Sequence, residues 1–210
     1  SEYSLVDSTI RIKQLIAACV RAGMPAVALT DESNMFGLVK FYKQCVAAGI
    51  KPIGGCDLWV SSPDDPRPWR LTLICQNRDG YLNLSRLVSR AWREGQGTGR
   101  ALVDASWLTP DAVHGLIAIA GRESEIGRAA LASGLQAASA RLSFLRRLFP
   151  ERLYLELTRT GRENEENWIR AAMALGGEHM LPVIASNDVR FLDRSGFESH
   201  EARTCINQGR

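Results

Sequence analysis

The sequence predicts an α/β fold of the barrel type. Short apolar runs of strand length alternate with longer segments of helical periodicity along the 210 residues. Several of these runs end in charged residues, as strands of α/β enzymes often do where they reach a functional site. We find no glycine-rich phosphate loop after any of them, and this favours a barrel over an open nucleotide-binding sheet.

Strand and helix alternate in the first half of the chain, with a turn-rich loop, "SSPDDPRP", at residues 61–68. Gly49 is placed to end a helix, because glycine tolerates the left-handed conformation that follows many helices. The elements expected are a helix capped by Ser8 or Thr9 and running through Arg21, a strand at 26–30, a helix at 35–48, strands at 51–60 and 71–76, and a helix from about 80 to 93.

The second half continues the alternation after a flexible loop at residues 95–99. The helix expected at 135–148 is amphipathic, with Arg141, Arg146 and Arg147 on its solvated side. The other elements expected are a strand at 116–120, a loop and short helix at 121–134, a strand at 153–157, a helix at 163–175, a strand at 181–185 and a helical pattern at 199–208.

Composition is that of an ordinary soluble globular protein, with 45% hydrophobic and 23% charged residues. A net charge of +3 does not indicate a nucleic-acid surface, and no apolar segment is long enough to span a bilayer. The five cysteines form no CxxC pair, which predicts buried thiols in a reducing cytoplasm. Because the chain opens without an initiator methionine or a targeting segment and stops within a helical pattern, we expect an internal fragment of a larger protein.

Charged residues gather where the expected strands end. Asp7 stands just before the first helix, and Arg70 stands at the entrance to the strand at 71–76. The residues that follow the other strands are Asp31, Glu32, Asp57, Arg122, Glu123, Asp188 and Arg190. Carboxylates that converge at one end of a barrel are suitable ligands for a divalent cation cluster.

Histidine and arginine argue against a metal at this position. His114 and His179 precede strands, which places them at the opposite end, and His200 belongs to the last helical pattern. Guanidinium groups cannot bind a metal, but they pair with carboxylates or phosphates. The residues therefore favour a charge-compensated pocket without metal, and unrelated surface charges remain the alternative.

The chain resembles a known family, the PHP domain of bacterial DNA polymerase III alpha subunits. The resemblance rests on "SEYSLVDSTIRIKQLI", "GMPAVALTDESNMFGLVKFYKQCVAAGIKPIGGCDLWV", "RLTLICQNRDGYLNLSRLVSRA", "LPVIASNDVRFL" and "FESHEARTCINQGR". It implies a distorted sevenfold β/α barrel, resembling a TIM barrel, over residues 1–210, with its first strand missing from this chain. Polymerase chemistry, a Mg²⁺-dependent nucleotidyl transfer, would then belong to a later domain of the full protein.

The resemblance also implies which positions hold metal in other members of the family. Asp7 and Asp188 keep an acidic ligand, and Asp57 stands where a glutamate is usual. Glu32 replaces a histidine beside Asp31. The remaining changes place arginine where the family has a histidine or cysteine, at Arg70, Arg122 and Arg190.

Three functions follow from the resemblance. The first is a catalytically silent, metal-free PHP domain that acts as a structural platform in DNA replication. Its expected partners are the proofreading exonuclease subunit and the rest of the polymerase III holoenzyme, while DNA would be contacted mainly by other domains and no membrane would be involved. The second is a Zn²⁺- or Mn²⁺-dependent phosphoesterase, acting as an exonuclease or pyrophosphatase. The third is a non-catalytic phosphate-binding pocket built by Arg70, Arg122 and Arg190.

Overall fold

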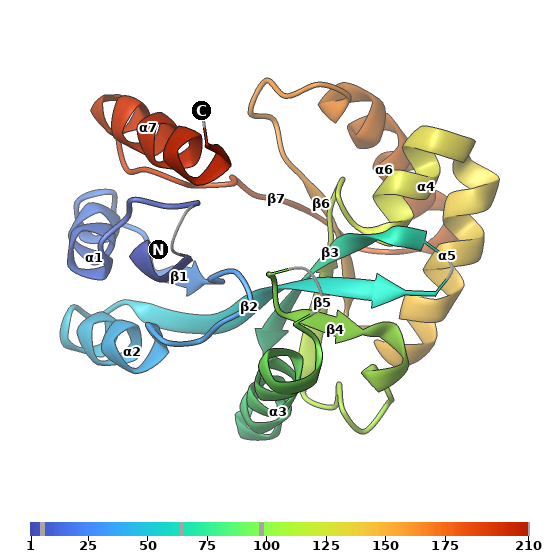
Figure 1. Ribbon diagram of the computed structural model, residues 1–210, viewed down its shortest axis with the longest axis horizontal. Coiled ribbons are helices and arrows are strands. Elements are labelled where there is room, and N and C mark those ends of the chain that lie inside the picture. Colours follow the sequence, from blue (N-terminus) through green and yellow to red (C-terminus); the bar gives the residue numbers. More distant parts are fainter. Residues whose placement is uncertain (5–6, 64, 97–98, 210) are drawn as a thin grey trace. The chain divides into compact units, whose positions relative to one another are not determined.

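A computed structural model describes residues 1–4, 7–63, 65–96 and 99–209. The chain forms two compact units, which can be followed by colour along the sequence in Figure 1. The first unit joins the two ends of the chain, Ser1–Cys56 and Val189–Arg210, and the second unit is Asp57–Asp188. We describe each unit by itself.

The first unit holds the expected helix, strand and helix. Its strand β1 (Ala26–Leu29) pairs in parallel with the beginning of β2 (Lys51–Ser62), from Ala26 opposite Lys51 to Leu29 opposite Gly54. The other elements of this unit are η1 (Glu2–Ser4), α1 (Ile12–Arg21), α2 (Leu38–Ala47), η3 (Arg194–Gly196) and α7 (Phe197–Gln208).

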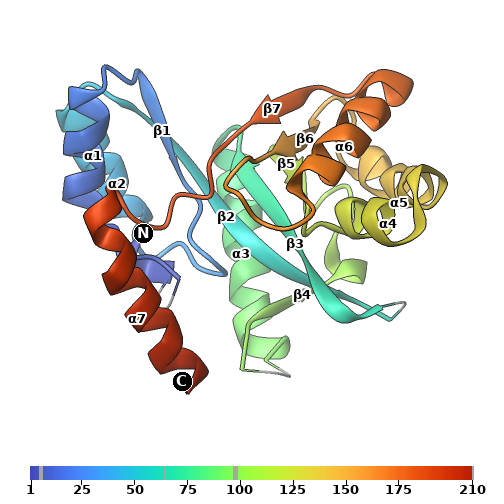
Figure 2. The same ribbon diagram turned by 90° about the horizontal axis from the view of Figure 1, so that it is seen from above.

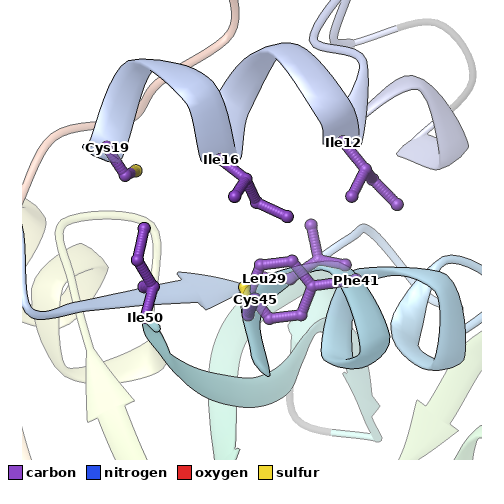
Figure 3. Close-up of a cluster of buried hydrophobic side chains, with 7 residues drawn as sticks. All are labelled: Ile12, Ile16, Cys19, Leu29, Phe41, Cys45 and Ile50. Atoms are coloured by element: carbon purple, nitrogen blue, oxygen red, sulfur yellow. The ribbon is translucent and has the colours of Figure 1, made fainter. Parts of the chain in front are cut away.

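The core of the first unit lies between α1, α2 and β1 (Figure 3). Helix α1 contributes side chains at the spacing of one helical face, and α2 contributes two more. The buried cluster is Ile12, Ile16, Cys19, Leu29, Phe41, Cys45 and Ile50. This packing explains why the sequence pattern predicted the existence of both helices.

Both helices begin later than the sequence predicts. Helix α1 has Arg11 at its N-cap without a side-chain bond, so the predicted cap at Ser8 or Thr9 is wrong. The Ser8 hydroxyl instead accepts from the Ile10 N–H at 3.3 Å. In front of α2, the Asn34 side chain accepts from the Phe36 N–H at 3.2 Å and holds a turn, so the helix begins only at Leu38.

The second unit contains the rest of the sheet. Strands β5, β6 and β7 are parallel neighbours, whereas β3 is antiparallel to β5 (Figure 2). The strand order is β2-β3-β5-β6-β7, with β4 beside β2. Its elements after β2 are β3 (Asp65–Cys75), α3 (Arg78–Glu94), β4 (Leu102–Asp104), η2 (Ala105–Trp107), β5 (Leu116–Ala120), α4 (Glu125–Ser133), α5 (Leu135–Leu148), β6 (Leu153–Leu157), α6 (Glu165–His179) and β7 (Val183–Ala185).

The prediction of a long loop at "SSPDDPRP" is wrong. Strand β2 continues to Ser62, and β3 already begins at Asp65. The two strands are neighbours in the sheet, so most of this segment has a strand partner despite its prolines. The sequence also missed β4, which is only three residues long. Gly97 and Thr98, in the loop predicted at 95–99, lie outside the described residues.

Helices α4, α5 and α6 pack together beside β5 and β6 (Figure 2). The exposed positions of Arg141, Arg146 and Arg147 on α5 confirm its predicted orientation. On β3, Trp69, Leu71 and Leu73 are buried at every second position, as one face of a strand requires. Among the described residues, no helix combines the length and the hydrophobicity that crossing a membrane would need.

The cysteine prediction is confirmed in part. The chain has no disulfide among its five cysteines, of which Cys19, Cys45 and Cys56 are buried and Cys75 and Cys205 are partly buried. Burial raises the pKa of Cys75 to about 11, so this thiol stays protonated and unreactive at neutral pH.

Candidate functional site

Several predicted site residues of the second unit lie where β5, β6 and β7 end. Parallel strands finish at one edge of the sheet, so Gly121 and Arg122 after β5 lie on the same side as Ser186 after β7. Arg70 belongs to this edge because β3 runs antiparallel to β5. Its backbone N–H donates to the carbonyl of Glu123 at 3.0 Å.

Asp57 and Arg70 form an ion pair between β2 and β3. The Arg70 guanidinium donates to one carboxylate oxygen of Asp57, and the Thr72 hydroxyl donates to the other. The side chains of Asp57 and Arg70 are only 15% and 20% exposed, so water screens their attraction weakly. The guanidinium also lies 5.7 Å from the centre of the Trp59 ring. Asp57 is therefore engaged by protein groups on both of its oxygens.

Glu156 on β6 joins this group, although the sequence reasoning did not select it. Burial raises the pKa of its carboxyl, and the hydrogen bond from the Ser186 hydroxyl lowers it. The negative charges of Asp57 and Asp188 raise the pKa and the positive charge of Arg70 lowers it, and burial, the largest effect, leaves the pKa raised overall. We call Asp57, Arg70, Glu156 and Asp188 the strand-end cluster.

Glycine at position 121 makes room for Glu156. A Cβ atom at Gly121 would lie 2.5 Å from Oε2 of Glu156, closer than two such atoms can approach. A side chain at position 121 would therefore require the Glu156 carboxylate to move away from its present place in the cluster.

Asp188 pairs with an arginine that the sequence reasoning also missed. Nη1 of Arg162 lies 2.9 Å from its carboxylate. Arg162 follows β6 in the loop at residues 158–164, and Glu165 organises that loop. The buried Glu165 carboxylate accepts from the N–H groups of Gly161 and Arg162 and from both the N–H and the hydroxyl of Thr160. Burial raises the pKa of Glu165, but these hydrogen bonds outweigh burial and lower it overall.

Arg122 lies at the same edge but does not pair with the strand-end cluster in any interaction that the structure shows. Its guanidinium is 2.9 Å from the carboxylate of Glu123 and donates to the carbonyl of Glu163 at 3.3 Å. Glu123 is also 3.5 Å from Arg128. Arg122 is therefore part of a second, more exposed ion-pair group.

In the first unit, Asp7 and Arg190 come together from the two ends of the sequence. Nη1 of Arg190 lies 2.6 Å from the Asp7 carboxylate, and the carbonyl of Arg190 accepts from the Thr9 N–H at 3.0 Å. His200 on α7 lies 3.6 Å from the other oxygen of Asp7, and its side chain is only 16% exposed. His200, which the sequence placed only in the last helical pattern, is therefore a mostly buried neighbour of Asp7.

Asp31 is buried and holds the local structure at the end of β1. Its carboxylate accepts from the hydroxyl groups of Ser1 at 2.8 Å and Ser4 at 2.7 Å. The Ser4 hydroxyl in turn accepts from the Glu32 N–H at 3.2 Å. These bonds give Asp31 a structural role at the end of β1.

The arginines at the predicted ligand positions thus each face a carboxylate. Arg70 pairs with Asp57, Arg190 with Asp7, and Arg122 with its neighbour Glu123. Within the part of the chain that the structure describes, no group of three or more His, Cys, Asp or Glu side chains is arranged to hold a metal ion. The sequence missed Glu156 because it sits inside an apolar strand, and it missed Arg162 because nothing local links that loop to Asp188.

The comparisons with known proteins agree with the family that the motifs suggested. The model of the PHP domain family matches residues 1–160. Over its whole length the chain is 47% identical to the DNA polymerase III subunit alpha of Pseudomonas aeruginosa and 40% identical to that of Escherichia coli. The chain covers 18% of each of these relatives.

A solved structure shows the same fold at low sequence identity. It is an amidohydrolase from Chromobacterium violaceum, 14% identical, with a TM-score of 0.57. The likeness covers 94% of this chain and 93% of the amidohydrolase, and it confirms the predicted α/β, barrel-type fold class. Since the family model matches well over half of its residues, the chain belongs to the PHP domain family.

Proposed function

We propose that this chain is a metal-free PHP domain that serves as a structural and partner-binding platform in a bacterial DNA polymerase III alpha subunit. Polymerase chemistry, which would use Mg²⁺, would be carried out by another domain of the full protein. We expect that protein to be cytoplasmic. The proofreading exonuclease subunit is the proposed partner, within the polymerase III holoenzyme. The identity of 40–47% with alpha subunits over the whole chain supports this assignment.

The observation that carries the metal-free part is the pairing of three site carboxylates with arginines. Asp57, Asp188 and Asp7 face Arg70, Arg162 and Arg190 respectively. A cluster of divalent cations needs anionic or neutral ligands, and a guanidinium offers neither a lone pair nor a tolerable charge. The donor set at these positions therefore does not fit the metal cluster known for the family.

The same ion pairs weigh against a phosphate pocket. A phosphate would have to compete with carboxylates that already neutralise Arg70, Arg122 and Arg190. An arginine that already pairs with a carboxylate of the protein would contribute little binding energy to an added phosphate. We therefore rank this function below the structural platform.

Metal content tests the proposal directly. The protein that contains this chain would be purified without chelators, and its zinc, manganese and iron would be measured by plasma mass spectrometry. A metal-binding PHP protein, purified in the same way, serves as the positive control. Well below one metal ion per chain supports the proposal, whereas a stoichiometric cluster, lost together with phosphoesterase activity on chelation, would establish the enzyme function instead.

Partner binding needs a separate experiment. The alpha subunit and the exonuclease subunit would be mixed as purified proteins and analysed by size-exclusion chromatography. Co-elution that is lost when the PHP domain is deleted supports the platform role. Undiminished co-elution after the deletion contradicts it.

A further inference from the structure

Helix α2 of the first unit has apolar side chains on two of its faces. Phe41 and Cys45 on one face are fully buried in the cluster with α1. Val39, Tyr42 and Val46 on another face are 63%, 58% and 56% exposed. A helix whose apolar surface extends beyond its buried face is expected to be covered there as well.

These exposed side chains form one continuous stripe. Val39, Tyr42 and Val46 are spaced by three and four residues, which makes them neighbours on the helix surface. Phe36, three residues before Val39 in the turn that leads into α2, extends the stripe and is 67% exposed. We call Phe36, Val39, Tyr42 and Val46 the α2 stripe. Single exposed apolar residues are normal, but a contiguous row of four large ones marks an interaction surface.

The charged residues of α2 and of the segments on either side of it are basic, and Glu2, which pairs with Lys40, comes from outside these segments. The sequence contains no acidic residue at 8–30 or at 33–56. The basic residues in these two ranges are all exposed, and they are Arg11, Lys13, Arg21, Lys40, Lys43 and Lys51. Lys40 is 3.5 Å from Glu2, whereas Lys43 has no ion pair or hydrogen bond with any described residue. Lys43 is four residues from Val39 and three from Val46, so it borders the stripe directly.

We propose that the α2 stripe is the docking site for an acidic, amphipathic segment of a partner protein. Apolar side chains of that segment would cover the stripe, and its carboxylates would face Lys43 and the neighbouring basic residues. This inference deepens the proposed platform function and rests on it.

Other occupants fit less well. A second copy of this chain, docked through the same stripe, would bring like charges together. Nucleic acid would match the charge, but a phosphate backbone offers no apolar surface to cover Phe36, Val39 and Val46. An acidic protein segment satisfies both features of the surface.

The test measures the affinity of the complete alpha subunit for the purified exonuclease subunit, the proposed partner, by biolayer interferometry. Val39→Glu and Lys43→Glu change the stripe and its border at exposed positions. Met173→Glu on α6 and Arg146→Glu on α5 are the matched controls, because both residues are exposed and belong to the second unit. We expect each α2 variant to weaken binding at least about tenfold, as central interface residues do, while the controls bind normally. We also expect binding to weaken with salt, and less steeply in Lys43→Glu.

Each other outcome overturns the inference in a recognisable way. If the wild-type subunit binds and the α2 variants bind equally well, the partner uses another surface and the platform function stands. If the wild-type subunit does not bind, the proposed function fails and this inference fails with it. If the α2 variants instead lose affinity for a primed DNA duplex, the surface belongs to nucleic acid. Protection of the Phe36 and Tyr42 side chains from hydroxyl-radical footprinting in the isolated subunit would show that its own chain covers the stripe.

Discussion

Removing the Arg70 guanidinium should destabilise the second unit strongly, because Asp57 would lose its counter-charge. Two opposite charges about 4 Å apart attract by roughly 4 kcal/mol at the effective dielectric constant of partly buried sites. Asp57 would keep the Thr72 hydroxyl, but it would face the negative charge of Glu156 without compensation. We therefore expect Arg70→Ala to cost about 2–4 kcal/mol, near the lower end of values for breaking a buried pair.

Hydrogen exchange followed by mass spectrometry is the assay, because it reports the local opening of β2 and β3 within the intact protein. A loss of about 2–4 kcal/mol corresponds to roughly 30- to 700-fold faster exchange when global or subglobal opening limits the rate. Arg146→Ala on the exposed side of α5 is the control and should change stability by less than about 0.5 kcal/mol. The double variant Asp57→Asn with Arg70→Met should recover most of the loss, because it leaves no unpaired charge. Exchange in Arg70→Ala that matches the control would refute the view that this pair holds the strand ends together.

Three further predictions concern the same edge of the sheet. Glu165→Gln should cost about 1–3 kcal/mol in urea unfolding, because the amide accepts the loop hydrogen bonds less strongly than the carboxylate does. Because the pKa of Glu165 is lowered in the folded protein, its contribution to the free energy of unfolding should be present above the unfolded pKa of about 4.3 and be lost as the pH falls below it. If the variant loses stability in acid as steeply as the wild type does, this prediction is wrong. Glu156→Gln should raise the thermal stability at neutral pH, because the raised pKa of Glu156 means that ionising this buried carboxyl costs stability as the pH rises. The gain should disappear near pH 4, where the carboxyl is protonated in both the folded and the unfolded protein. Gly121→Ala should cost about 1–2 kcal/mol by displacing the Glu156 carboxylate, and Glu156→Ala in the same chain should remove that penalty.

The sequence was sufficient for much of the first unit and for most helices and strands of the second. The pattern placed Ile10, Leu15, Ile16 and Cys19 on one side of the first helix, and all but the partly buried Leu15 are buried. Ile10 lies just before the helix, and Ile12 completes its buried face. The strands at 116–120 and 153–157 and the helix at 135–148 have the predicted bounds. These elements could be predicted because hydrophobic periodicity is a local property that burial enforces.

Local signals failed where an interaction with a distant residue decided the outcome. The prolines of "SSPDDPRP" indicated a loop, but β2 and β3 extend through most of it because each has a strand beside it. Ser8 has the side chain of a helix cap, yet its hydroxyl donates to the carbonyl of Arg190, 182 residues away.

The candidate site shows the same division. The sequence by itself determined which residue types stand at the strand ends, and the resemblance to the PHP family predicted that arginine replaces metal ligands at three of them. Only the tertiary structure decided which carboxylate each arginine faces, that antiparallel β3 carries Arg70 to the carboxyl ends of its neighbours, and that Glu156 and Arg162 belong to the group. The physical reason is that the charge of a side chain is fixed by its residue type, whereas the pairing of charges depends on strand direction and register.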